Sequence, residues 1–126
     1  MNLRCVLDAQ AGLADHPTSC ITIPEDWDAL PDGICMDADG KLWIALFGGG
    51  AVTRWDPQDG RLMQTVELPC RQVTSCCFGG PDLDQLFITT ARRGLDLHAL
   101  AEQPLAGGLF QLSLGIKGCR AQEFRI

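Results

Sequence analysis

The chain has 126 residues, 46% of them hydrophobic and 21% charged, with a formal net charge of −6 at pH 7, a composition that suits one globular domain with one modest core. The negative charge and the lack of a basic cluster argue against nucleic acid and against an anionic membrane as partners. The longest apolar run, "LWIALF" at 42–47, is far too short to cross a bilayer.

The N-terminal part, residues 1–24, predicts two strands. Its start, "MNLRCVLDAQAG", has one arginine, a short apolar stretch and an early aspartate. This is not the pattern of a secretory signal, so we expect a cytoplasmic location. The segments "NLRCVLDAQAG" and "TSCITIPED" are typical of the outer two strands of a unit that precedes the first complete one.

Residues 31–69 predict a complete antiparallel unit of four strands. The Asp-Gly of "DADG" (37–40) is a strong hairpin signal, and "GGG" (48–50) and "DPQDG" (56–60) separate the strands that follow. The first two strands are almost wholly apolar, as expected where both faces are covered, whereas the last alternates between apolar and polar residues. Buried inner strands and alternating outer strands are typical of one propeller blade.

The pattern recurs over residues 73–126, with an insertion at 91–108 that predicts a short helix. Thr74 stands 42 residues after Asp32, within the repeat period of roughly 40–50 residues that propellers show. We therefore predict a single all-β domain over 1–126, a partial β-propeller of about two and a half four-stranded blades with exposed sheet edges. The three tryptophans are interpreted as core and blade-packing residues.

Cysteine and histidine usage indicates neither a disulfide framework nor a zinc site. The seven cysteines are odd in number and no C-x-x-C occurs, so we expect free thiols in a reducing compartment. Adjacent Cys76 and Cys77 would point to opposite faces of a strand, and we interpret both as small buried hydrophobes. His98 lacks a Cys or acidic partner at metal-ligand spacing, so we expect it on the surface.

The residue that bears most on function is Asp32, in the Pro-Asp-Gly turn of "LPDGICMDADGKLWIALFGGG". An aspartate in a turn can simply accept a hydrogen bond from its own backbone. An aspartate that opens an inner strand can also face a cavity. The segments 37–40 and 56–60 faintly resemble calcium loops, but they lack alternating ligands and a closing glutamate, so we interpret them as turns. No G-x-S-x-G, P-loop or H-E-x-x-H motif occurs.

From about Leu30 to Leu114, the Pro-Asp-Gly turn, the "SCCFGG" run and the "AGGLF" strand occur in an order that resembles the SMP-30/gluconolactonase/regucalcin-like family. The resemblance implies a six-bladed propeller with a divalent metal at the mouth of its channel and, in many members, hydrolysis of sugar lactones. It implies that Asp32 is a metal ligand and the catalytic base. The implied metal is calcium, with zinc, magnesium or manganese as alternatives, because a hard cation binds carboxylate oxygen.

The resemblance covers only the C-terminal part of that family, and the family's other metal ligands and substrate-holding residues have no counterpart here. One carboxylate cannot hold calcium tightly, because calcium takes about six to eight oxygen ligands. The nearby candidates in sequence for further ligands are Glu25, Asp26 and Asp28, in the loop that leads to Asp32. Three interpretations stay open. The chain is a lactone hydrolase completed by a missing N-terminal half or by a second copy, a non-catalytic half-propeller fragment, or an oligomerising binding module.

Overall fold

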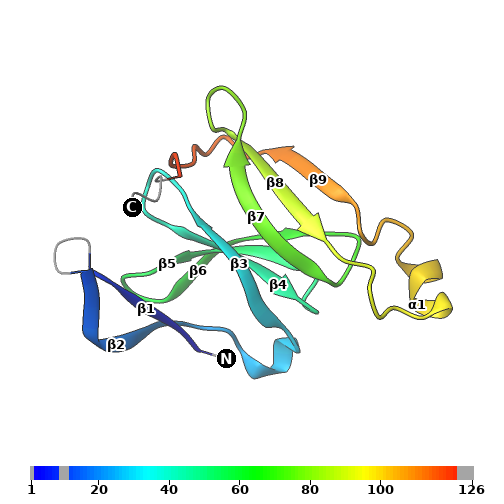
Figure 1. The fold of residues 1–126 in the computed structure, drawn as a ribbon, viewed down its shortest axis with the longest axis horizontal. Coiled ribbons are helices and arrows are strands. Elements are labelled where there is room, and N and C mark those ends of the chain that lie inside the picture. Colours follow the sequence, from blue (N-terminus) through cyan, green and yellow to red (C-terminus); the bar gives the residue numbers. More distant parts are fainter. Residues whose placement is uncertain (1, 9–11, 122–126) are drawn as a thin grey trace.

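The computed structural model describes residues 2–8 and 12–121, which form three antiparallel sheets in succession along the chain (Figure 1). The first sheet pairs β1 (Asn2–Asp8) with β2 (Gly12–Thr22). The second contains β3 (Leu30–Met36), β4 (Leu42–Phe47), β5 (Ala51–Asp56) and β6 (Arg61–Glu67) in that order. The third contains β7 (Val73–Gly79), β8 (Gln85–Thr90) and β9 (Leu109–Ser113). This architecture confirms the predicted all-β, partial propeller.

Two short helices lie outside the sheets in the part of the chain that the structure describes. The 3-10 helix η1 (Glu25–Trp27) leads into β3, and α1 (Leu97–Glu102) lies in the predicted insertion, with the Asp96 carboxylate accepting a hydrogen bond from the Ala99 amide as its N-cap. His98 is exposed on α1, 3.4 Å from Glu102 one turn later, which confirms the predicted surface position. Among the described residues, no helix has the length and hydrophobicity needed to cross a membrane.

The turn between β4 and β5 requires its three glycines. Gly48 and Gly50 have φ angles of 87° and 65°, a region that L side chains rarely adopt, and their amides donate to the Arg71 carbonyl at 2.9 and 3.0 Å. A Cβ on Gly49 would lie 2.8 Å from the Ala29 Cβ. The turn therefore packs directly against the segment that enters β3 and against the one that enters β7.

The second and third sheets repeat one another in register. Ile34 pairs with Ile44 in the second sheet, and Cys76 pairs with Ile88 in the third. The β3–β4 ladder is irregular between Pro31 and Ile34, and the β7–β8 ladder between Val73 and Ser75. Asp32 and Thr74 therefore occupy corresponding irregular positions of the two inner strands.

The repeat over residues 73–126 predicts a fourth strand for the third sheet at "CRAQEFRI" (119–126), and the described part of this segment shows none. Residues 119–121 carry no strand, and 122–126 lie outside the described residues. The preceding segment runs beside the β3–β4 turn instead: Gly118 forms an isolated bridge with Asp37, and the Ala38 amide donates to the Lys117 carbonyl at 2.8 Å.

The core consists of two clusters on the two faces of the second sheet. The cluster toward the third sheet contains Trp43, Ala45, Val52, Val73, Cys76, Leu86 and Ile88. The other contains Ile21, Ile23, Ile44, Leu46 and Trp55. Alternate residues of β4 enter different clusters, so the strand is buried on both faces, as its apolar run predicts. Trp43 and Trp55 are buried and Trp27 packs against the second cluster, which confirms their predicted role.

The interpretation of the adjacent cysteines is half wrong. Cys76 is 4% exposed, but Cys77 is an exposed residue. The two side chains do point to opposite faces of β7, as the period of a strand dictates. The prediction of burial was wrong for Cys77, because no described strand covers the face of β7 on which it lies.

Candidate functional site

Asp32 lies on the open face of an edge strand. β3 is the end strand of its sheet, and its exposure alternates so that every second residue faces outward. Asp32 shares this outward face with three large apolar side chains, Leu30, Ile34 and Met36, which are 52%, 43% and 49% exposed. We call these four residues the β3 strip. Isolated apolar side chains are common on protein surfaces, but a row of them on an edge strand is typical of a surface that another element covers.

The Asp32 carboxylate does not behave as a turn aspartate. In the turns of the same sheet, Asp37, Asp56 and Asp59 each accept a hydrogen bond from the amide two residues later, at 2.9 Å. No hydrogen bond or ion pair joins the Asp32 side chain to another of the described residues. The local turn interpretation of Asp32 is therefore not supported, and its oxygens are available to an external partner.

The described residues do not by themselves fit a calcium site around Asp32. Nowhere in the described ranges do three His, Cys, Asp or Glu side chains gather in a group that could hold a metal. Glu25, Asp26 and Asp28 are all exposed around η1, so they do not join Asp32 as a ligand set. The Thr74 hydroxyl, at the corresponding position of the next sheet, is 2.8 Å from the Thr89 hydroxyl.

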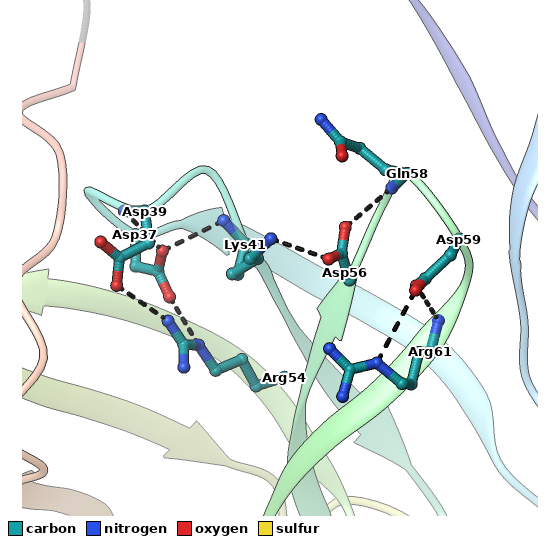
Figure 2. Close-up of polar contacts among 8 residues, drawn as sticks. All are labelled: Asp37, Asp39, Lys41, Arg54, Asp56, Gln58, Asp59 and Arg61. Atoms are coloured by element: carbon teal, nitrogen blue, oxygen red, sulfur yellow. Dashed lines mark hydrogen bonds and ion pairs between the residues drawn. The ribbon is translucent and has the colours of Figure 1, made fainter.

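A second aspartate, Asp37, has the opposite environment. It is fully buried, and Figure 2 shows how it and its neighbours form a connected polar network. Its Oδ1 accepts hydrogen bonds from the amides of Asp39 and Lys41 at 2.9 and 3.0 Å. Its Oδ2 accepts from Trp43 Nε1 and Arg54 Nε, both at 2.8 Å. Two donors at each oxygen leave this carboxylate no capacity for a cation.

The network extends from Asp37 along the end of the sheet. Arg54 also contacts Asp39 at 3.2 Å and lies 5.8 Å from the centre of the Trp43 ring, while Lys41 pairs with Asp56 at 2.8 Å. Burial raises the pKa of Asp37, but the hydrogen bonds from Trp43 and Arg54 and the positive charge of Arg54 outweigh it and hold the pKa below its ordinary value. The network is thus a structural feature.

The sequence predicts the "DADG" turn and the buried Trp43 as separate features and does not predict the network that joins them. The available signal was the spacing of Asp37, Trp43 and Arg54, because Trp43 and Arg54 are cross-strand partners once the β4–β5 hairpin is in register. That register depends on the glycine turn at 48–50, whose exact geometry the sequence alone does not define.

Comparison with known proteins identifies relatives over most of the chain. A family model described as SMP-30/Gluconolactonase/LRE-like region matches residues 3–92. Regucalcin of Danio rerio is 48% identical over 112 residues, which is 88% of this chain and 38% of that protein. Regucalcin of Homo sapiens is 45% identical over 112 residues, 88% of this chain and 37% of the relative.

Solved structures agree with these relatives. The crystal structure of a calcium-binding protein, regucalcin, from Agrobacterium tumefaciens superimposes with a TM-score of 0.89 at 35% identity, over 99% of this chain and 42% of that one. A luciferin-regenerating enzyme superimposes with a TM-score of 0.74 at 34% identity, over 89% of this chain and 38% of that one. The chain thus spans less than half the length of these proteins.

Proposed function

Because this chain belongs to the SMP-30/gluconolactonase/LRE-like family, as the sequence resemblance predicted, we propose that Asp32 is a divalent-cation ligand and base in a sugar-lactone hydrolase site that other residues complete. The observation that carries the proposal is the exposed Asp32 carboxylate, which has no partner among the described residues although other aspartates of its sheet are satisfied locally. A carboxylate without such partners can bind a cation or accept a proton from water.

Calcium is the proposed cation, since hard cations prefer carboxylate oxygen and the solved neighbour from Agrobacterium tumefaciens is named a calcium-binding protein. The described residues contribute one carboxylate, Asp32, of the about six to eight oxygen ligands that calcium takes. The proposal therefore requires ligands from a longer polypeptide or from a second copy of this chain.

The β3 strip favours a second candidate, a non-catalytic half-propeller that associates through β3. Three large apolar side chains around Asp32 are half exposed, and an edge strand with such a face readily pairs with another chain. In that case Asp32 lies in the surface through which the chains associate, and its replacement changes neither calcium affinity nor lactone turnover.

The first test is the native mass of the chain, measured by light scattering with and without millimolar calcium. Calorimetric titration of calcium and a lactone hydrolysis assay follow. We expect Asp32→Asn to lose calcium binding and turnover, while Asp82→Asn, a matched change at an exposed turn aspartate, retains both. Equal calcium binding and turnover in Asp32→Asn and in the wild type would overturn the enzymatic proposal. A monomer that binds no calcium and hydrolyses no lactone would also overturn it for this chain alone.

A further inference from the structure

Two thiols meet where the second and third sheets pack together. Cys35 of β3 and Cys76 of β7 are 41 residues apart, and their Sγ atoms lie 3.7 Å from each other. The strands that carry them belong to different sheets and run side by side near the middle of the molecule (Figure 1). No disulfide joins them in this structure, because both cysteines are free.

The backbones of β3 and β7 approach very closely beside this pair. A Cβ on Gly33 would lie 2.7 Å from the Ser75 Cα, a distance that real side chains do not adopt. Gly33 lies two residues before Cys35, and Ser75 directly precedes Cys76, so the glycine allows the approach that places the thiols together.

The two thiols differ in access. Cys76 is 4% exposed, and its Sγ lies 3.6 Å from the Trp43 carbonyl oxygen within the core. Cys35 is half-buried and lines a cavity of about 360 Å³, whose other lining residues include Cys77 and Cys119. A small reagent in this cavity reaches Cys35, whereas Cys76 is not among the residues that line it.

We propose that Cys35 and Cys76 are a reversible disulfide-forming pair, in which a small hydroperoxide oxidises Cys35 and Cys76 resolves the product, cross-linking β3 to β7. The hydrogen bond with Cys76 lowers the pKa of Cys35, although burial and the Asp37 charge oppose it. The same hydrogen bond, together with burial, raises the pKa of Cys76. Cys35 lines the cavity and Cys76 is only 4% exposed, so access assigns the attacking thiolate to Cys35, and the thiolate is the nucleophile.

The chemistry balances with a hydroperoxide as the only oxidant. The Cys35 thiolate attacks one peroxide oxygen, the O–O bond breaks, and the leaving hydroxide or alkoxide takes a proton, which leaves Cys35 as a sulfenic acid. The Cys76 sulfur then attacks the Cys35 sulfur, the S–O bond breaks, and the leaving hydroxide takes the Cys76 proton to form water. Two thiols lose two electrons, and with hydrogen peroxide the reduced products are two waters.

The other nearby cysteines are poorer resolving partners for Cys35. Cys77 and Cys119 line the same cavity as Cys35, but of the described cysteines only Cys76 has its sulfur in contact with that of Cys35. The Cys119 thiol also donates a hydrogen bond to the Asp37 carbonyl at 3.2 Å. Closing the Cys35–Cys76 bond requires the sulfurs to approach from 3.7 Å to about 2.05 Å. Rotation of the two side chains, one of which faces a cavity, accommodates this change.

The test is peptide mapping of the full chain after treatment with hydrogen peroxide and alkylation of the remaining thiols. Trypsin together with a glutamate-specific protease separates Cys35 from the cysteines before Glu25. We expect a cross-linked fragment that joins Cys35 to Cys76, an intact mass lower by two hydrogen atoms, and reversal by dithiothreitol. The link closes a long loop, so the oxidised chain should melt higher than the reduced one by roughly 10 °C.

Matched variants identify the partners. Because Cys76 and Cys77 are adjacent and share their fragment, the mapping is repeated in Cys77→Ser and in Cys119→Ser, both of which should keep the cross-link. Cys35→Ser should abolish it, and Cys76→Ala should leave a Cys35 sulfenic acid that a dimedone probe traps. If Cys76→Ala does not fold, the peptide maps of the wild type and of Cys77→Ser still show whether Cys35 is linked to Cys76. Alkylation of both cysteines after peroxide, or a dominant link between any other pair, would overturn the proposal.

Discussion

Replacing Asp37 by asparagine should destabilise the chain far more than a single conservative change normally does. The amide can still accept from the Asp39 and Lys41 backbone, but its NH₂ group then faces the donors of Trp43 and Arg54. Arg54 is 12% exposed, so it becomes a largely buried, poorly paired charge. Removing one partner of a buried ion pair costs about 3–5 kcal/mol. We expect the lower end, about 3 kcal/mol, because Arg54 keeps its contact with exposed Asp39.

Urea unfolding followed by tryptophan fluorescence measures this cost, and the corresponding fall in melting temperature is about 10 °C for a chain of this length. Asp59→Asn is the matched control, since Asp59 and Arg61 are 57% and 64% exposed and 3.7 Å apart; it should change stability by less than about 0.5 kcal/mol. A loss below about 1 kcal/mol in Asp37→Asn would refute the argument, because it would mean that the buried carboxylate contributes no more than a neutral hydrogen bond.

Three further predictions concern the same strands. The pKa of Asp37 in the folded chain lies below its ordinary value of 3.8. The ionised Asp37 therefore stabilises the fold fully above pH 3.8, and this stabilisation is lost as the pH falls through the lowered pKa. Below about pH 4, the urea midpoint should fall more steeply in the wild type than in Asp37→Asn. Gly33→Ala should cost about 1–3 kcal/mol in the same assay, because the new Cβ meets the Ser75 backbone, and an unchanged midpoint would contradict the close approach of β3 and β7. Asp32→Asn should alter stability by less than about 0.5 kcal/mol, since Asp32 is exposed without a described partner; a larger loss would show that its carboxylate supports the fold.

The sequence predicts the sheets well because their signals are local. Asp-Gly and Gly-Gly-Gly turns mark the hairpins of the second sheet, and the apolar run of β4 predicts burial on both faces, which is observed at Trp43 and Ile44. The exposure of Cys77 could not be predicted in this way, because strand period indicates which face a residue occupies but not whether a neighbour covers that face.

The candidate site is less predictable because it depends on contacts between distant segments. The Asp37–Arg54 bond requires the register of the β4–β5 hairpin, and the Cys35–Cys76 contact requires packing of one sheet on another. For Asp32 the sequence left a turn role and a ligand role open. The hydrogen bonds of its carboxylate bear on that choice, and only the folded structure shows them.

Asp32 and Asp37 illustrate why residue type alone does not locate a metal site. The two aspartates are five residues apart: Asp32 lies near the start of β3, and Asp37 directly follows its end. The Asp37 oxygens already accept four hydrogen bonds in the interior, so binding a cation there would require breaking a network that stabilises the sheet. The Asp32 oxygens give up only water. The same substitution should therefore separate the two roles: asparagine at 37 should reduce stability, and asparagine at 32 should reduce cation binding while leaving the unfolding midpoint unchanged. If both variants lost stability, Asp32 would belong to the fold and the metal-site proposal would lose its main support.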